Sequence, residues 1–159
     1  MKKVILSIAI IATVVSSYGQ VTITETKDEM TDKVTYVADG LLCANADQSI
    51  GFRIDPNITV KNDVKEANNI IISMAGLGSC NEKNTMIILF ENGDKITIVS
   101  WGKFNCKSYC YFALSKAHIK LLSTVEISKI RLTNGESYKS HTSEIEHKKY
   151  FIELFEALK

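Results

Sequence analysis

The sequence predicts an α+β fold: a mainly antiparallel β-sheet, sandwich-like or curved, with a short helix near residues 115–122 and a C-terminal helix near residues 143–158 packed on the sheet. Three observations predict it. Short apolar runs flank turn signatures such as Asn92-Gly93. Apolar and polar side chains alternate with period two in the first half of the chain, whereas the last segment has helical periodicity.

The first half of the chain contains four segments predicted as strands. They alternate apolar and polar side chains or are largely apolar, and they comprise residues 21–26, 33–37, 49–54 and 70–72. The third is expected to stop at Asp55-Pro56-Asn57, a combination typical of turns. The fourth follows a polar stretch, residues 61–69, for which no strand is predicted.

A central hairpin is predicted around Asn92-Gly93, with residues 85–90 and 95–101 as its strands. Both strands carry apolar side chains on both faces, so the hairpin is expected in the buried middle of a sheet. A two-residue turn pairs residues whose numbers sum to 185. If Asp94 joins a three-residue bulged loop, the sum becomes 186.

The rest of the chain predicts a helix, a hairpin and a second helix. Ser115 can cap a helix through Leu122. Residues 125–133 then return as a strand, and Asn134-Gly135 leads into a strand over residues 136–140.

The C-terminal helix is predicted from its cap and its periodicity. Ser143 and Glu146 have the spacing of a capping box. Apolar side chains follow at i, i+3, i+4 and i+7, namely Phe151, Leu154, Phe155 and Leu158. This face is expected to cover the sheet, so Leu154→Asp is expected to unfold the domain.

The N-terminus has the pattern of a secretory signal peptide. Met1-Lys2-Lys3 precedes a 12-residue apolar run, residues 4–15, and small residues follow. A membrane anchor is the alternative, but 12 helical residues span only about 18 Å of a ~30 Å hydrocarbon core. Cleavage is predicted between Gly19 and Gln20, and the protein is expected to be periplasmic or secreted.

Cleavage would leave residues 20–159 as a single globular domain, large enough for one core without a metal. Loss of Lys2 and Lys3 leaves 17 basic against 18 acidic residues. No second apolar stretch approaches the length of a membrane span, and no basic stripe indicates a nucleic-acid partner.

Four cysteines are expected to form two disulfides, because export places them in an oxidising compartment. Extension of the central hairpin would bring Cys80 close to Cys106, so this pair is preferred, which leaves Cys43 with Cys110. A ring between Cys106 and Cys110 is the closest rival. Their three-residue spacer does not fit a thioredoxin-like or zinc motif.

A dense aromatic stretch begins at Trp101 and continues through Phe112. Exposed Trp and Tyr offer large rigid contact areas, so Trp101, Phe104 and Tyr109 are the candidate binding surface. The alternative is that Trp101 and Phe112 pack around the disulfides as core.

No catalytic, metal or cofactor residues are assigned. The histidines, His118, His141 and His147, lack the motif of a zinc hydrolase and are expected on the solvated surface. Gly76-Leu77-Gly78 lacks the third glycine of a dinucleotide site. The leading hypothesis is a non-enzymatic envelope domain that binds a protein, peptide or glycan or has a structural role. The alternative is a small secreted hydrolase or thiol-redox protein that uses His118 or Cys110.

Several motifs, together with a closing amphipathic helix, are similar to those of small exported bacterial proteins of unknown function. They cover about half of the chain and comprise Phe90-Glu91-Asn92-Gly93, Phe104-Asn105-Cys106 and Ile127-Ser128-Lys129-Ile130-Arg131-Leu132-Thr133-Asn134-Gly135. The Ser-Tyr-Gly-Gln at the end of the signal is also similar. The resemblance implies a bacterial exported domain with a sheet and a packed helix, and it implies no catalytic residue.

Overall fold

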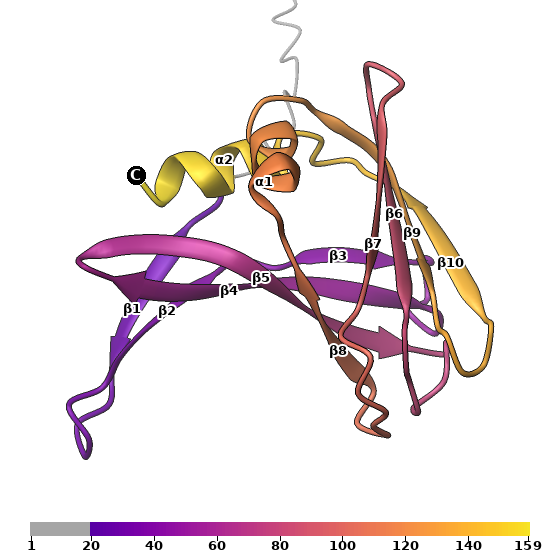
Figure 1. Cartoon of the computed structure of the whole chain (residues 1–159), viewed down its shortest axis with the longest axis horizontal. Coiled ribbons are helices and arrows are strands. Elements are labelled where there is room, and N and C mark those ends of the chain that lie inside the picture. Colours follow the sequence, from indigo (N-terminus) through magenta and orange to yellow (C-terminus); the bar gives the residue numbers. More distant parts are fainter. Residues whose placement is uncertain (1–19) are drawn as a thin grey trace, which may run out of the picture.

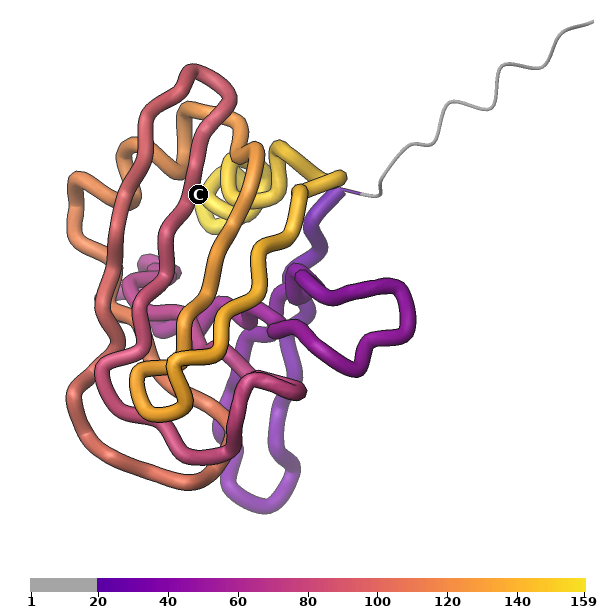
Figure 2. The backbone as a smooth tube through the Cα atoms, turned by 90° about the vertical axis from the view of Figure 1, so that its right-hand side faces the viewer, coloured from indigo at the N-terminus to yellow at the C-terminus, as the bar shows by residue number. Residues whose placement is uncertain are grey.

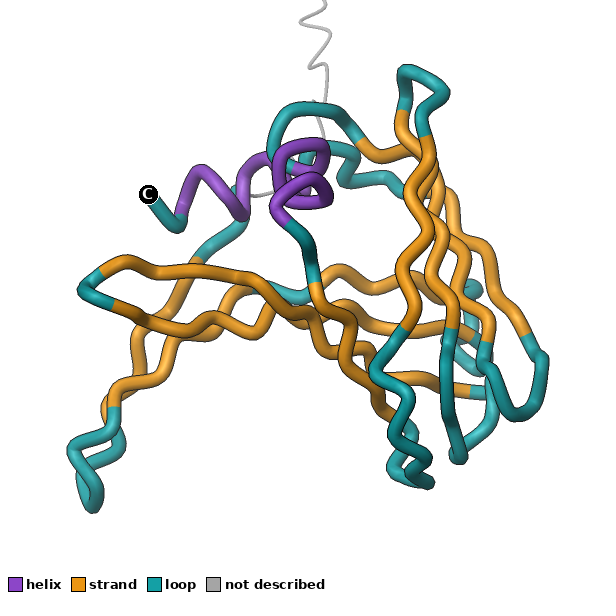
Figure 3. The backbone as a smooth tube through the Cα atoms, in the orientation of Figure 1, coloured by secondary structure: helices purple, strands orange, loops and turns teal. Residues whose placement is uncertain are grey.

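The computed structural model describes residues 20–159 as three antiparallel sheets with two short helices (Figures 1 and 3). In chain order the elements are β1 (Ile23–Lys27), β2 (Val34–Ala38), β3 (Leu41–Ala44), β4 (Gly51–Lys61), β5 (Val64–Ala75), β6 (Thr85–Phe90), β7 (Lys95–Val99), β8 (Tyr109–Ala113), α1 (Lys116–Leu122), β9 (Ile127–Thr133), β10 (Ser140–Glu144) and α2 (Tyr150–Ala157). The expected antiparallel sheet and both helices are present, but the fold is richer in strand than the α+β prediction. The predicted signal peptide, including Gly19, lies outside the described residues.

Two four-stranded sheets form the body of the molecule. Their strand orders are β10-β9-β6-β7 and β3-β4-β5-β8, and β1 and β2 form a separate hairpin. The first sheet stands upright against the second in Figure 1, and the two helices lie in the angle between them. On one side the sheets meet where the Trp101 amide donates to the Tyr111 carbonyl, 3.0 Å away.

The core lies between the two sheets because alternate residues of each strand point inward. Cross-strand neighbours such as Ile54, Ile72 and Cys110 are all buried, as are Met86 and Ile98 on the other sheet. The buried apolar residues form a single cluster.

The C-terminal helix is shorter than predicted. It begins at Tyr150 rather than near residue 143, and Ser143 lies instead in β10 opposite Ile130. Pairing with β9 wins over the capping box because it buries Ile145 and gives its amide the Ser128 carbonyl at 2.9 Å. The predicted apolar face is correct from Phe151 onward. The strand predicted over residues 136–140 forms later, at Ser140–Glu144.

The predicted turn at Asp55-Pro56-Asn57 is wrong. β4 continues through Pro56 to Lys61, although proline cannot donate to a strand ladder. This is tolerated because β3 pairs with β4 only as far as Ile54, so beyond that residue β4 has no ladder partner on the β3 side.

The polar stretch 61–69 is mostly the start of β5. Asn62 and Asp63 have φ values of 51° and 61° and join β4 to β5 in a two-residue turn. Asn-Asp is a weaker signal of such a turn than Asn-Gly, which explains why this hairpin was missed.

The central hairpin forms as predicted, but its register differs. Partner numbers sum to 184, as in the pair Met86 with Ile98, because the loop consists of Glu91, Asn92 and Gly93. The Gly93 amide donates to the Phe90 carbonyl, and φ at Gly93 is 89°. Val99 lies on the opposite face of β7 from the buried Ile98, and it is 53% exposed rather than buried.

The short helix α1 confirms the predicted cap. The Ser115 hydroxyl accepts from the His118 amide, and His118 Nδ1 accepts in return from the Ser115 amide. Neither α1 nor α2, the helices of the described residues, is long and apolar enough to cross a membrane.

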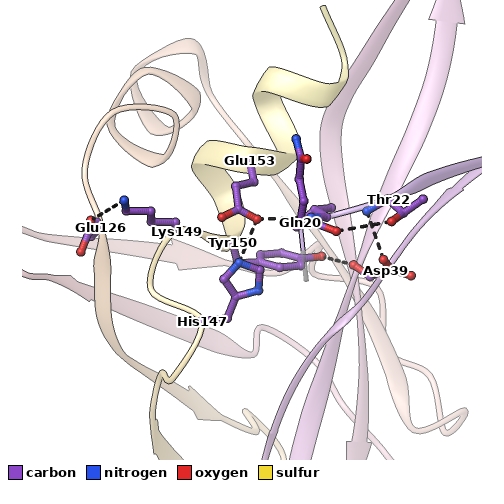
Figure 4. A network of polar contacts seen from close by, with 9 residues as sticks. Gln20, Thr22, Asp39, Glu126, His147, Lys149, Tyr150 and Glu153 are labelled. Atoms are coloured by element: carbon purple, nitrogen blue, oxygen red, sulfur yellow. Dashed lines mark hydrogen bonds and ion pairs between the residues drawn. The ribbon is translucent and has the colours of Figure 1, made fainter. Parts of the chain in front are cut away.

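A polar network fixes the start of the described chain to α2 (Figure 4). The amide of Val21, which is buried, donates to Glu153 Oε2 at 3.2 Å, and the same oxygen lies 2.9 Å from His147 Nε2. The Tyr150 hydroxyl donates to the Asp39 carbonyl at 2.7 Å. The first described residues and the C-terminal helix α2 are therefore held together by hydrogen bonds.

Candidate functional site

A surface pocket of about 450 Å³ lies beside the segment that joins β7 to β8. This segment is at the end of the molecule away from the helices (Figure 1). Four lining side chains are aromatic and two are lysines, and the set is Trp101, Lys103, Phe104, Asn105, Lys107, Tyr109, Cys110 and Tyr111. We call it the aromatic pocket.

All three residues of the predicted binding surface line the aromatic pocket. Trp101 is 56% and Phe104 54% exposed, and Tyr109 is half-buried. Trp101 therefore does not pack as core, whereas Phe112 is fully buried, as that alternative expected.

The aromatic rings have defined mutual positions. The rings of Trp101 and Tyr111 stack with centroids 5.5 Å apart and an interplanar angle of 23°. Tyr109 meets Tyr111 edge-on, at 5.7 Å and 86°. One face of the Trp101 ring is thus supported by Tyr111, and the exposure of Trp101 leaves much of its remaining surface to solvent.

A disulfide and a pair of asparagines hold the segment that carries these rings. Cys80 is bonded to Cys106, as predicted. Next to the disulfide, Asn81 and Asn105 exchange two backbone hydrogen bonds of 2.8 and 3.1 Å. The Asn81 side chain also donates to the Tyr109 carbonyl at 3.3 Å. Figure 2 shows loop 77–84 and segment 100–108 side by side.

The predicted disulfide is correct although the predicted hairpin register is not. The ladder that sums to 184 continues to Asn84 and Ser100, where the Ser100 amide donates to the Asn84 carbonyl at 2.8 Å. The bridge between Asn81 and Asn105 sums to 186, so an irregular stretch shifts the pairing before the cysteines.

Further buried asparagines extend this support to the turn after β9. Asn84 donates to Asn81 Oδ1 at 3.2 Å and accepts from the Gly135 amide at 2.8 Å. Asn134 donates to the Cys80 carbonyl at 3.0 Å. A Cβ on Gly135 would lie 1.9 Å from the Glu82 carbonyl oxygen, so only glycine fits at that position.

Three lysines surround the rings. Lys103 and Lys107 line the pocket, and the side chain of Lys83 lies against Gly102, where an added Cβ would be 3.8 Å from the Lys83 Cγ. No ion pair within residues 20–159 involves any of the three. The pocket lining contains no carboxylate.

The second predicted disulfide, Cys43 with Cys110, is not formed. Both cysteines are free and buried. They lie on β3 and β8, the two edge strands of one sheet, and three strand spacings separate these edges by about 14 Å. A disulfide needs Cα atoms within about 7 Å. The rival ring between Cys106 and Cys110 is excluded by the bond to Cys80.

Burial keeps both free thiols protonated. Desolvation raises the pKa of Cys43 to about 12. Desolvation also raises the pKa of Cys110 to about 11, against the opposing effect of a hydrogen bond with Asn84. The buried Cys110 therefore carries a neutral thiol, which is a poor nucleophile.

The histidines are less exposed than predicted. Each is half-buried rather than solvated. His118 completes the α1 cap, His147 contacts Glu153, and His141 Nε2 lies 2.9 Å from the Ser143 hydroxyl. In the part of the chain that the structure describes, no three His, Cys, Asp or Glu side chains converge as a metal site.

No protein-family model, curated protein or solved structure matches this chain. The resemblance to small exported bacterial proteins therefore stays a prediction. Residues that the sequence reasoning did not assign to the site include Tyr111, Lys103 and Lys107. A signal for Tyr111 was available, because residues two apart in a strand share a face and Tyr109 was already a candidate.

Proposed function

We propose that this protein is an exported, non-enzymatic binding domain that uses the aromatic pocket to hold its ligand. The observation that carries the proposal is the combination of exposure and bracing at Trp101 and Phe104. More than half of each side chain is in water, yet their segment is tied down by a disulfide and by buried asparagines. Rings held in position lose little freedom on binding, which favours affinity.

Export is supported by the N-terminal pattern and by the disulfide. A basic start and a short apolar run precede Gly19 in the sequence. Disulfides such as Cys80–Cys106 persist in oxidising compartments. Val21, two residues after Gly19, is already part of the buried core. The proposal places the domain in the periplasm or outside the cell.

Ligand binding can be measured directly because Trp101 is the only tryptophan of the chain. The purified protein is titrated with panels of neutral glycans, acidic glycans and peptides, and Trp101 emission is followed. A saturable change with at least one class is expected. Phe104→Ala should weaken that binding about tenfold or more. The matched control Tyr138→Ala, at an 82% exposed ring outside the pocket lining, should leave it unchanged.

Export is tested separately. The full chain is expressed in a bacterial host, the periplasmic and cytoplasmic fractions are separated, and the N-terminus is determined by mass spectrometry. The expected product is periplasmic or secreted and begins at Gln20. An intact, cytoplasmic Met1 form would contradict this part of the proposal.

The alternative function is a small secreted hydrolase or thiol-redox protein. An observation in favour of a hydrolase is the contact between His141 Nε2 and the Ser143 hydroxyl, 2.9 Å apart. Labelling by a fluorophosphonate probe, lost in Ser143→Ala, would favour it. For a redox role, a thiol reagent should react with Cys110 in the native protein. We expect neither reaction in the native protein. When the protein is unfolded without reductant, two thiols, those of Cys43 and Cys110, should become reactive.

A further inference from the structure

We propose that the ligand of the aromatic pocket is an acidic glycan that carries uronic-acid carboxylates. This inference rests on the proposed binding function and narrows it to one ligand class. Three properties of the pocket support it: its charge, the state of its backbone donors, and the arrangement of its rings.

The charge of the pocket is uniformly positive. Lys103 and Lys107 belong to its lining, Lys83 adjoins it at Gly102, and no carboxylate lines it. None of these ammonium groups is neutralised by an ion pair within residues 20–159. An anionic ligand would therefore gain charge-assisted hydrogen bonds without breaking an ion pair of the protein.

Several backbone amides of the segment are already hydrogen-bonded within the protein. The amides of Trp101, Asn105 and Ser108 donate to the carbonyls of Tyr111, Asn81 and Ser79. The Lys107 amide donates to Asn105 Oδ1 at 3.1 Å. An extended peptide is normally recognised through free backbone donors. The use of these four amides within the protein therefore favours a ligand recognised by its rings and charges.

The rings suit a saccharide. Trp101 presents a broad apolar surface, and its supporting partner Tyr111 stacks at 5.5 Å. A pyranose ring has an apolar face of C–H groups that can lie on such a surface. The pocket of about 450 Å³ accommodates a short ligand segment rather than a folded partner.

Single-stranded nucleic acid also combines rings with negative charge. It is bound along basic grooves that follow several phosphates. The whole chain carries 19 basic and 18 acidic residues, and the positive charge here is confined to three lysines. The local charge therefore favours a short acidic glycan, and an oligonucleotide serves as a competing probe.

The test titrates the protein with tetragalacturonate and, as matched ligand, its methyl ester, which keeps the rings and removes the charges. Trp101 emission and calorimetry report binding. We expect the acid to bind at least about tenfold more tightly than the ester. Raising the ionic strength should weaken the binding of tetragalacturonate but not that of its methyl ester.

Variants locate the charges. Lys103→Gln and Lys107→Gln should each weaken tetragalacturonate binding about threefold to tenfold, and together about thirtyfold. Lys116→Gln, an exposed lysine outside the aromatic pocket, is the matched control and should leave it unchanged. All of these lysines are exposed, so the variants are expected to fold normally.

The outcomes separate this inference from the function on which it rests. Equal binding of acid and ester, tighter binding of a thymidine oligonucleotide, or Phe104-dependent binding only of neutral glycans or peptides would overturn the acidic glycan but keep the binding domain. Absence of binding in every class would overturn both.

Discussion

Two parts of the molecule project away from the helices and expose apolar side chains: the segment between β7 and β8, and the β1–β2 hairpin (Figure 1). Trp101 and Phe104 are 56% and 54% exposed in the first. Met30 and Val37 are 93% and 57% exposed in the second. Exposure alone does not distinguish them.

Their support does. The β7–β8 segment is held by the Cys80–Cys106 disulfide and by the Asn81 side chain. The β1–β2 hairpin has its own five-residue ladder and, near the tip, the Asp28 carboxylate that accepts from the Met30 and Thr31 amides. The difference indicates that exposure together with ordered side chains identifies a binding surface. Side chains that become ordered only on binding lose conformational entropy, and this loss reduces affinity.

A change in the shared core should remove both regions. Leu154 is fully buried on α2, and an aspartate there would bury an unpaired charge. Leu154→Asp is expected to cost more than about 4 kcal/mol and to abolish folding. Circular dichroism during heating measures this. Leu154→Met, which keeps the volume, should cost less than about 1.5 kcal/mol.

Loss of the disulfide should affect the β7–β8 segment first. Its 26-residue sequence separation predicts that Cys80→Ser with Cys106→Ser lowers the free energy of unfolding by about 3–4 kcal/mol. Trp101 emission should become more accessible to an acrylamide quencher, while amide exchange in β1 and β2 stays as before. Wild type in a strong reductant is the control and should behave like the variant. A change of less than about 1 kcal/mol in both would contradict the assigned role of the disulfide.

Loss of one buried amide should have a smaller effect in the same place. Asn81→Ala leaves the side-chain Nδ2 of Asn84 without its acceptor, Asn81 Oδ1, at an expected cost of about 2–3 kcal/mol. Urea denaturation measures it. Asn68→Ala, at an exposed asparagine on β5, is the matched control and should cost less than about 0.5 kcal/mol.

The free thiols predict a stability that falls with pH. Burial raises the pKa of Cys43 to about 12 and that of Cys110 to about 11, above their ordinary value of 9.0. Above pH 9 the unfolded chain therefore releases thiol protons that the folded chain keeps. At pH 10 this lowers the free energy of unfolding by about 1.4 kcal/mol per thiol.

This pH effect is measured by urea denaturation between pH 8 and pH 10. Cys43→Ala and Cys110→Ala should each flatten the decline by their own share, whatever their effect on stability at pH 8. If the free energy of unfolding declines with pH as steeply in both variants as in the wild type, the thiols are not the cause of the decline.

The smallest effect is expected at the tip of the β1–β2 hairpin. Met30→Ser removes an apolar side chain that is 93% exposed, so stability should change by less than about 0.5 kcal/mol. Ligand binding in the aromatic pocket should not change. A loss of binding in this variant would mean that the hairpin, rather than the pocket alone, contacts the ligand.

The sequence predicted elements that depend on local signals. Asn92-Gly93 located the central hairpin, Ser115 located the start of α1, and the spacing of Phe151 and Leu154 located the buried face of α2. Each signal acts through residues at most a few positions apart, so no knowledge of the remainder of the fold was needed.

Predictions that depend on distant partners were less successful. The capping-box spacing of Ser143 with Glu146 was outweighed by pairing with β9, and Pro56 was tolerated because β3 ends beside it. Cys43 and Cys110 were paired by elimination, but the topology places them on opposite edges of a sheet. For the candidate site, the sequence indicated the aromatic residues. It did not indicate that lysines without an ion-pair partner among the described residues would lie around them.

The disulfide also bears on the order in which the chain folds. Cys80 and Cys106 enclose β6 and β7, so the covalent loop contains one complete hairpin and no other strand. Hairpins close in microseconds, before pairings between distant strands such as β6 with β9. In an oxidising compartment the disulfide is therefore expected to form early. The later docking of β9 would then start from a β6–β7 hairpin that is already cross-linked. Refolding of the oxidised chain should accordingly be faster than that of the reduced chain.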